Sequence, residues 1–234
     1  MASRKRRALF AAGLVAALVL LNWLYQVARK PAELFFPVSG ALTKTPTETW
    51  REYQTLFRRY STPVMTPELL AALAQVEGAG NPVATTPWRL RVSVDPREIY
   101  RPASSAVGMY QMTDGTFDQA KRYCVRNHAA VEDCWFNCLY TRVIPSHAVE
   151  LAAAYLDRRV GAIVERTRTT KATLAQKQEL AALIHLCGAA AGEAYAARGF
   201  RLAPNQRCGQ HDARAYLARV AAMKRLFAGL ATLD

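Results

Sequence analysis

The sequence has few acidic residues, few charged residues overall, and almost no runs of alternating β-branched residues. Asp and Glu number 18 against 31 Lys and Arg, and charged residues make up 21% of the 234 positions, against 51% hydrophobic. This balance excludes a wholly disordered chain, because there is enough apolar surface to form a core. The lack of strand-like alternation outside Leu90 to Val94 argues against a sheet protein, and the lack of internal repeats argues against a solenoid.

The basic excess does not by itself indicate nucleic acid. The net charge is +13, but six basic residues flank an apolar run at the N-terminus, and the other 25 outnumber the 18 acidic residues by only seven. No stripe of Lys and Arg with interleaved stacking aromatics is visible, so we expect no nucleic-acid partner. A moderately basic domain suits an anionic polymer, but its charge is too diluted along the chain to identify that polymer.

The N-terminus is typical of an export signal. Arg4 to Arg7 form a basic cluster directly before Ala8 to Tyr25, eighteen residues interrupted in polarity only by Asn22. As a helix this run measures roughly 27 Å, close to the thickness of the hydrocarbon core of a bilayer. Positive charge stays in the cytoplasm, which sends the rest of the chain to the periplasm. Because no small-x-small cleavage site follows, we favour an uncleaved, single-pass inner-membrane anchor over a removed signal peptide or a buried core helix.

The chain is therefore divided into three parts. Residues 1–30 are the cytoplasmic basic cluster and the anchor, residues 31–48 are a linker, and residues 49–234 form one domain. Proline, glycine and threonine in the linker leave no period long enough to pack.

Within the domain the hydrophobic pattern has a helical period. Thr66 is expected to be an N-cap and Pro67 the first residue of a helix that ends at Gly78 or Gly80. Further helices are predicted over residues 114–128, 146–164, 174–191 and 212–230. The fold class is thus mainly α.

Five cysteines are many for a cytosolic chain of this size and ordinary for an exported one. The odd number suggests two disulfides and one free thiol. We expect Cys187 to pair with Cys208, and Cys124 to pair with either Cys134 or Cys138. The first bond should stabilise the C-terminal region by roughly 3 kcal/mol.

Two other uses of the cysteines stay open. Cys124, His128, Cys134 and Cys138 also have a spacing that could bind zinc. A nucleophilic pair of Cys187 with the histidine two positions earlier is less favoured, because residues two apart on a helix point away from each other. The oxidising compartment favours disulfides, so we expect no metal.

The predicted chemistry rests on Glu77. This glutamate closes an apolar stretch over residues 69–76 and precedes the Gly-Ala-Gly-Asn-Pro sequence of residues 78–82, a break that leaves its side chain at a helix end. Partial desolvation favours the protonated form of a carboxyl group, which is the form that a general acid needs. Taken alone, a glutamate near a helix end is usually a solvated surface charge.

Further motifs give Glu77 a context. Downstream of Asn81 and Pro82 come Ser-Ala-Val-Gly-Met-Tyr-Gln-Met-Thr at residues 105–113, then Tyr-Leu at residues 155–156, then the stretch around Gly188. From Thr66 to Gly192 the sequence resembles the lytic transglycosylase family of the goose-lysozyme-like superfamily, in which motifs of these kinds occur in this order.

The resemblance implies a lysozyme-like helical domain that acts on peptidoglycan glycan strands without a cofactor. The reaction would cleave the β-1,4 bond between N-acetylmuramic acid (MurNAc) and N-acetylglucosamine (GlcNAc) and close a 1,6-anhydro ring, with Glu77 as acid and then base. The residues implied to bind substrate are Ser105, Gly108, Met109, Tyr110, Gln111, Tyr155 and His185. For Met109, Tyr110, Tyr155 and His185 a plain core position is the alternative.

Departures from the family pattern keep a second function open. Gly78 stands in place of a serine, Ala148 in place of an asparagine, and His185-Leu186 in place of Tyr-Asn. The longer spacing between Glu77 and the residues 105–113 motif predicts an inserted hairpin or lid at residues 85–102. The alternative is therefore a non-catalytic, membrane-anchored protein on the same fold that binds peptidoglycan or assists secretion assembly. Such a protein would work with an envelope-spanning secretion machine.

The sequence offers no clear second catalytic acid. Asp95 precedes Pro96 in a turn, Glu98 is expected to be a solvated loop charge, and Asp114 is expected to cap a helix. An ordinary glycosidase needs two carboxyl groups, whereas the reaction implied here needs one.

Overall fold

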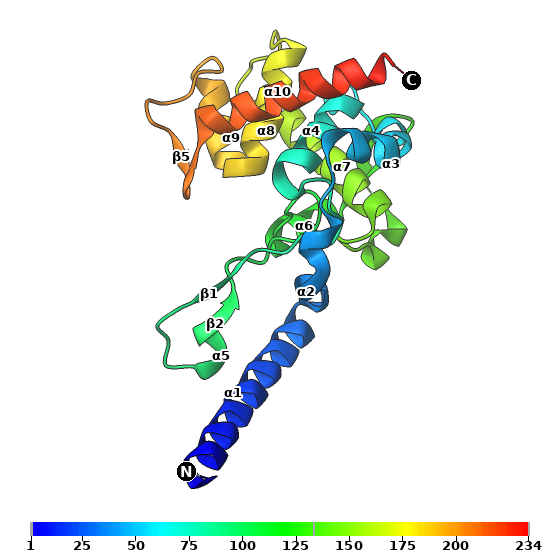
Figure 1. Cartoon of the computed structure of the whole chain (residues 1–234). Helices are drawn as coiled ribbons and strands as arrows, with labels where there is room; N and C mark the ends of the chain where they lie inside the picture. Colours follow the sequence, from blue (N-terminus) through cyan, green and yellow to red (C-terminus); the bar gives the residue numbers. More distant parts are fainter. Residues whose placement is uncertain (1, 133, 234) are drawn as a thin grey trace.

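The computed structural model describes residues 2–132 and 134–233, and over these residues the chain is mostly helical with three short antiparallel hairpins (Figure 1). In chain order the helices are α1 (Ala2–Arg29), α2 (Phe36–Ser39), α3 (Pro46–Arg59), α4 (Pro67–Gly78), α5 (Pro96–Ile99), α6 (Asp114–Ala120), α7 (Pro145–Arg166), α8 (Leu174–Cys187), α9 (Ala189–Ala197) and α10 (Ala213–Ala231). The 3-10 turns are η1 (Pro31–Phe35), η2 (Gly40–Leu42) and η3 (Trp135–Leu139). The strands are β1 (Trp88–Leu90), β2 (Tyr100–Pro102), β3 (Tyr123–Arg126), β4 (Ala129–Glu132), β5 (Arg207–Cys208) and β6 (His211–Asp212).

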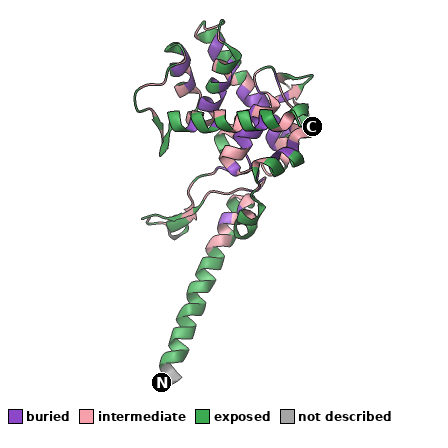
Figure 2. Cartoon of the chain, turned by 45° about the horizontal axis from the view of Figure 1, so that its top comes forward, coloured by how far each residue is buried: buried purple, intermediate pink, exposed green. Residues whose placement is uncertain are grey.

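Helix α1 projects away from the rest of the molecule, and most of it is exposed (Figures 1 and 2). Its residues Arg4–Arg29 are long and apolar enough to cross a membrane. The following segment contains the short turns η1, α2 and η2, and then α3 begins at Pro46, slightly before the predicted start of the domain. Thr45 and Glu48 form a capping box there, in which each side chain bonds to the backbone N–H of the other, at 3.3 and 2.8 Å.

The core is built around α4. Residues 69–74 of this helix are buried on all sides, and α3, α7 and α10 pack against it (Figure 2). Aromatic rings fill the space between α3 and α10, where Trp50 contacts Phe227 with ring centroids 5.8 Å apart. A helix that is apolar on all faces belongs in the middle of a domain, so α4 gives the site a fixed platform.

Helices α4, α7 and α10 confirm, within a few residues, the helices predicted from Pro67 to Gly78 or Gly80, over residues 146–164 and over residues 212–230. The one predicted over residues 174–191 is two helices, because Gly188 adopts a positive φ of 82° and separates α8 from α9.

The helix predicted over residues 114–128 is only half right. Helix α6 ends at Ala120, and β3 and β4 form a hairpin in place of the second half. Its two turn residues, Asn127 and His128, have φ values of 49° and 60°, the left-handed pair that a two-residue hairpin turn requires. The turn chemistry therefore overrides the helical pattern.

The inserted hairpin predicted over residues 85–102 is present as β1 and β2, joined by the short helix α5. At the base of the hairpin, an isolated β-bridge pairs Thr85 with Val107. The hairpin itself lies beside the C-terminal part of α1 (Figure 1).

Candidate active site

Glu77 lies in the last turn of α4, and 17% of its side-chain surface is exposed. The helix stops one residue later because Ala79 takes a left-handed conformation with φ of 48°, which caps the last turn. The carboxyl group is thus held on a buried helix at the point where the chain turns away.

Two side chains from distant parts of the chain approach the same oxygen of Glu77. The hydroxyl of Tyr216 donates to Oε1 at 2.5 Å, and Nε2 of His185 lies 3.7 Å from Oε1. The first is a short hydrogen bond, whereas the second distance is too long for one. Oε2 carries no hydrogen bond from any described side chain. The Glu77 carboxyl group therefore has one oxygen held by the protein and one left for another partner.

Burial raises the pKa of Tyr216 well above its usual range, and the charge and hydrogen bond of Glu77 raise it further. The phenol therefore stays protonated and remains a donor to Glu77 throughout the neutral range.

A disulfide connects the two elements that carry these partners. His185 lies in the last turn of α8, and Tyr216 lies in the first turns of α10. Cys187, at the end of α8, is bonded to Cys208 in the β5–β6 hairpin that leads into α10, with the Cα atoms 5.2 Å apart. The Cys187–Cys208 disulfide predicted from the sequence therefore ties together the two elements that approach Glu77.

The residue after the glutamate packs directly on neighbouring backbone. A Cβ atom on Gly78 would lie 2.7 Å from Cα of Met109 and 3.0 Å from the carbonyl oxygen of Gly108. Gly78 itself is buried. The absence of a serine at this position thus has a steric reason in this chain, because the end of α4 and the 108–109 backbone are in contact.

Three residues expected to bind substrate form a tightly held loop beside α4. Gly108 has φ of 80°, and the Nε2 amide of Gln111 donates to the carbonyl oxygens of Gly108 and Ala84, at 3.0 and 3.1 Å. The hydroxyl of Ser105 accepts from the backbone of residue 114, and Arg142 donates to its carbonyl oxygen at 2.9 Å. These bonds fix the loop, and the roles of the three residues toward substrate stay predictions.

Three other expected substrate residues lie in the core. Met109 is 0% exposed and Tyr110 1%, and the Tyr110 hydroxyl donates to the carbonyl oxygen of Leu70 at 3.1 Å. Both side chains belong to the hydrophobic core, which is the alternative position given for them above, and a role toward substrate stays a prediction. Tyr155 is also buried, with the guanidinium of Arg159 over its ring.

A family model of the transglycosylase SLT domain matches residues 55–176, just over half of the chain. The chain belongs to the transglycosylase SLT domain family. No curated protein and no solved structure gives a significant match. The family fits a glycan-cleaving enzyme of the lytic transglycosylase type, with peptidoglycan as its substrate class.

The matched SLT segment contains Glu77, but both of its side-chain partners lie beyond residue 176. The order of the motifs indicates His185 as a site residue, and in the structure this histidine lies beside Glu77. Tyr216 was not singled out, because nothing local marks a tyrosine in an Ala-rich helix 139 positions after the glutamate.

The second disulfide of the SLT chain joins Cys124 to Cys134, and Cys138 is a free, exposed thiol. Of the two partners predicted for Cys124, Cys134 is confirmed and Cys138 is wrong. The β3–β4 hairpin brings the Cα atoms of residues 124 and 134 to within 5.9 Å of each other, while Cys138 lies on η3 beyond the hairpin.

Since Cys124 and Cys134 bond to each other and Nδ1 of His128 contacts Ser61, these residues form no zinc site here. Among the described residues, no group of three or more His, Cys, Asp or Glu is placed to hold a metal.

The other carboxylates considered as catalytic partners are engaged elsewhere. Asp95 is the N-cap of α5, and Glu98 pairs with Arg29 and Arg101, so Glu98 is not the solvated loop charge that the sequence suggested. Asp114 pairs with Arg142 at 2.7 Å and is the first residue of α6, which Thr113 caps in its place.

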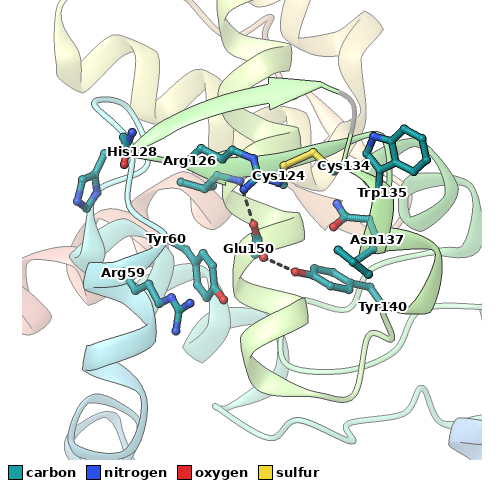
Figure 3. A pocket seen from close by; sticks show the side chains of 13 residues that line it. Arg59, Tyr60, Cys124, Arg126, His128, Cys134, Trp135, Asn137, Tyr140 and Glu150 are labelled. Atoms are coloured by element: carbon teal, nitrogen blue, oxygen red, sulfur yellow. Dashed lines mark hydrogen bonds between the residues drawn. A yellow bond between two sulfur atoms is a disulfide. The ribbon is translucent and has the colours of Figure 1, made fainter.

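A pocket of about 640 Å³ lies away from Glu77, between the end of α3, the β3–β4 hairpin, η3 and the start of α7 (Figure 3). In its wall, Glu150 accepts from the backbone N–H of Val125 at 3.0 Å and from the hydroxyl of Tyr140 at 2.7 Å. Burial and the bonded carboxylate raise the pKa of Tyr140, so this donor also stays protonated. With both oxygens bonded, Glu150 holds β3 against α7 and is a structural carboxylate.

Proposed function

We propose that this chain is a membrane-anchored peptidoglycan lytic transglycosylase with Glu77 as its catalytic residue. The observation that carries the proposal is the asymmetric environment of the Glu77 carboxyl group. Tyr216 occupies Oε1 at 2.5 Å, and Oε2 has no side-chain partner among the described residues. A proton on Oε2 is thus free to be transferred, while the Oε1 bond fixes the orientation of the group.

The reaction proceeds in two proton transfers. Protonated Glu77 gives its proton to the oxygen of the β-1,4 bond between MurNAc and GlcNAc, and that bond breaks with release of the GlcNAc end. The Glu77 carboxylate then accepts the proton of the C6 hydroxyl of the same MurNAc ring, whose oxygen attacks C1 and closes the 1,6-anhydro ring. Glu77 ends in the protonated form in which it began, so one carboxyl group serves both steps.

Tyr216 and His185 are positioning residues in this scheme. A phenol that stays protonated donates to the carboxylate formed after the first transfer, and a hydrogen bond to a charged group is worth about 1.5–3 kcal/mol. His185 lies close enough to Oε1 to stabilise the same charge whenever it is protonated. Neither residue has a carboxyl group, so neither supplies the second carboxylate that an ordinary glycosidase uses.

The engagement of the other carboxylates considered supports an anhydro product over hydrolysis. Most glycosidases that use water have two carboxyl groups flanking the scissile bond. Asp95, Glu98, Asp114 and Glu150 are each engaged by a guanidinium, a backbone N–H or a phenol. The reaction proposed here needs only Glu77.

The location follows from the N-terminal helix. With Arg4 to Arg7 retained in the cytoplasm and α1 crossing the inner membrane, the domain lies in the periplasm, where its substrate is found. Two disulfides are consistent with that compartment. A reporter that fluoresces only in the cytoplasm, fused to the C-terminus, is expected to give dark cells, and bright cells would contradict this topology.

The decisive experiment is digestion of purified sacculi by the full chain in detergent, followed by mass spectrometry of the released muropeptides. Wild type is expected to release fragments ending in 1,6-anhydro-MurNAc, and the folded Glu77→Gln variant none. Reducing MurNAc ends would identify a hydrolase, and undiminished release by Glu77→Gln would remove the catalytic assignment. Binding to sacculi without any release by wild type would favour the non-catalytic alternative, to which the departures at Gly78 and Ala148 point.

A further inference from the structure

The inserted hairpin of residues 85–102 is fastened to one side of α1 by polar contacts. The Nδ2 amide of Asn22 donates to the carbonyl oxygen of Tyr100 at 2.7 Å, and the Nε2 amide of Gln26 donates to that of Arg97 at 2.8 Å. Arg29 adds an ion pair with Glu98 at 3.0 Å. Positions 22, 26 and 29 follow one another along a single face of a helix. The hairpin therefore lies along about two turns of α1.

The contact explains the polar interruption of the apolar run. Asn22 is the one strongly polar residue between Ala8 and Tyr25, and an amide at membrane depth needs a hydrogen-bond partner because lipid offers none. The carbonyl oxygen of Tyr100 is the partner of the Nδ2 group, while Oδ1 of Asn22 has no hydrogen-bond partner among the described residues.

Between the hairpin and α1 runs an apolar groove of about 530 Å³. Its lining consists of residues on one face of α1, two residues of α2 and two aromatic rings of the hairpin: Ala16, Val19, Leu20 and Trp23, then Phe36 and Pro37, then Trp88 and Tyr100. From the first to the last of the α1 residues the groove follows the helix for roughly 10 Å, at 1.5 Å per residue. That part of α1 belongs to the candidate span, so the groove lies at the depth of the lipid chains if α1 crosses the membrane.

The hairpin has two different faces. Because side chains alternate along a strand, Trp88 and Leu90 project to the side of the groove and Arg89 to the other. Arg89 lies opposite Arg101 in the register of the two strands. Leu90 is highly exposed, and Val92 and Val94 beyond it are fully exposed. These three apolar side chains alternate in the sequence with Arg91, Ser93 and Asp95, so the tip carries both apolar and polar groups. Its exposed apolar side chains are unfavourable in water and favourable in lipid.

The basic residues of the hairpin suit the lipid headgroups. Arg89 and Arg91 are exposed, and neither has an acidic partner within residues 2–132 and 134–233. Basic residues next to a membrane span are attracted to anionic phosphates. The apolar groove, the exposed apolar side chains of the tip and the two guanidinium groups therefore all match one ligand, a phospholipid of the bilayer that α1 enters.

We infer that the 85–102 hairpin is a lipid-binding element that seats the catalytic domain on the membrane surface. An acyl chain of an anionic phospholipid occupies the groove beside α1, the side chains of Leu90, Val92 and Val94 reach into the membrane interface, and Arg89 and Arg91 face the phosphates. The inference rests on the proposed membrane anchor. It goes beyond that anchor because it assigns a ligand to a segment inserted between Glu77 and the substrate loop, and so fixes the height of the active site above the membrane.

Brominated phospholipids, which quench tryptophan only on close contact, test the inference on the full chain. The chain has four tryptophans, and each test variant keeps one and replaces the others by phenylalanine. The variant that keeps Trp88, in vesicles whose acyl chains carry bromine, is expected to be quenched as strongly as the variant that keeps Trp23. The variant that keeps Trp50, which is 3% exposed in the core, is the unquenched control.

The outcomes separate the hairpin from the anchor. Quenching of Trp23 without quenching of Trp88 overturns the inference and leaves the anchor standing, whereas quenching of neither contradicts the anchor itself. Brominated phosphatidylglycerol is expected to quench Trp88 more than brominated phosphatidylcholine, and the Arg89→Gln, Arg91→Gln double variant is expected to lose that preference. Equal quenching by both lipids in the parent would remove the assignment of an anionic headgroup. A photo-cross-linking residue at position 90 is expected to label lipid in cells, and a discrete protein adduct would overturn the lipid assignment.

Discussion

Tyr216 donates its phenol hydrogen to Oε1 of Glu77 across 2.5 Å, although 139 residues separate them in the sequence. The bond joins the first turns of α10 to the last turn of α4, the two helices that pack most extensively in the domain. The orientation of the proposed catalytic acid thus depends on a segment outside the matched SLT region.

Replacing Tyr216 by phenylalanine removes this bond and leaves the ring in place. We expect muropeptide release from sacculi to fall by about 10- to 100-fold, which corresponds to the loss of one hydrogen bond to a charged group. The melting temperature should fall by a few degrees at most, because the ring stays packed and the net contribution of one hydrogen bond to stability is about 0.5–1.5 kcal/mol.

The matched control is Tyr195→Phe. Tyr195 donates to Oε2 of Glu179 at 2.7 Å, so this variant loses the same kind of bond away from Glu77. Its activity should equal that of wild type. An equal loss of activity in both variants would mean that the Tyr216 effect reflects general stability.

Alkaline pH should destabilise the fold. Six tyrosines have pKa values raised mainly by burial, namely Tyr53, Tyr60, Tyr110, Tyr140, Tyr195 and Tyr216. In the unfolded chain they release protons near pH 10, and in the folded chain only at higher pH, so the folded state binds more protons above about pH 10. The free energy of unfolding therefore decreases as pH rises through that region.

The Tyr216→Phe variant tests how much Tyr216 contributes to the loss of stability at alkaline pH. Each tyrosine that ionises only in the unfolded state contributes at most about 1.4 kcal/mol per pH unit to the slope. Urea titrations between about pH 9 and pH 11 should show a shallower decline for the variant than for wild type. An identical slope would show that Tyr216 ionises equally in both states.

The Cys187–Cys208 disulfide should affect activity as well as stability. Its removal in the double serine variant frees the end of α8, which carries His185, from the hairpin before α10, which carries Tyr216. Closing a loop of this length contributes about 3 kcal/mol in the chain-entropy treatment, so the melting temperature should fall markedly. Activity per folded molecule should fall too, since both partners of Glu77 are loosened.

The Cys124→Ser, Cys134→Ser variant provides the comparison. Its loop closes 10 residues against 21, and its hairpin does not carry either partner of Glu77. It should lose a similar amount of stability and keep its activity per folded molecule. Equal loss of activity in both variants would contradict a positioning role for the Cys187–Cys208 bond.

Features that depend on neighbouring residues in the chain can be predicted from the sequence. An apolar stretch ending in Glu77 and a glycine-rich break define α4 and its C-terminus, and the long spacing to Ser105 defines the inserted hairpin. The Tyr216 contact depends on how α10 packs along α4, which no local pattern encodes.

Other differences have specific physical causes. An apolar pair such as Met109 and Tyr110 can face a cleft or the core, and only the packing against α4 decides. The sequence around Asn127 and His128 also fits a helical pattern. The left-handed turn at these two residues becomes evident only when the pairing of β3 with β4 is known. The choice of Cys134 over Cys138 then follows from the hairpin that this turn creates.

The thiols can be counted directly. In unreduced, unfolded protein, alkylation should label a single cysteine, and peptide mapping should place the label on Cys138. Reduction should expose the other four. Labelling of all five thiols without reduction, together with stoichiometric metal, would establish the zinc alternative and remove both disulfides.

Gly78→Ser would introduce the serine that the family pattern has at this position, and we expect it to destabilise this chain. The added Cβ would lie 2.7 Å from Cα of Met109, and backbone at that distance cannot rotate away as a side chain can. Overpacking of this kind costs about 1–3 kcal/mol. Gly161→Ala in α7 is the matched control, because a Cβ there meets nothing within 4 Å and the change should stabilise the helix by up to about 1 kcal/mol. Chemical denaturation of both variants decides the point. A stable and more active Gly78→Ser protein would show that the end of α4 can separate from residues 108–109, and that the glycine is not required by the contact seen here.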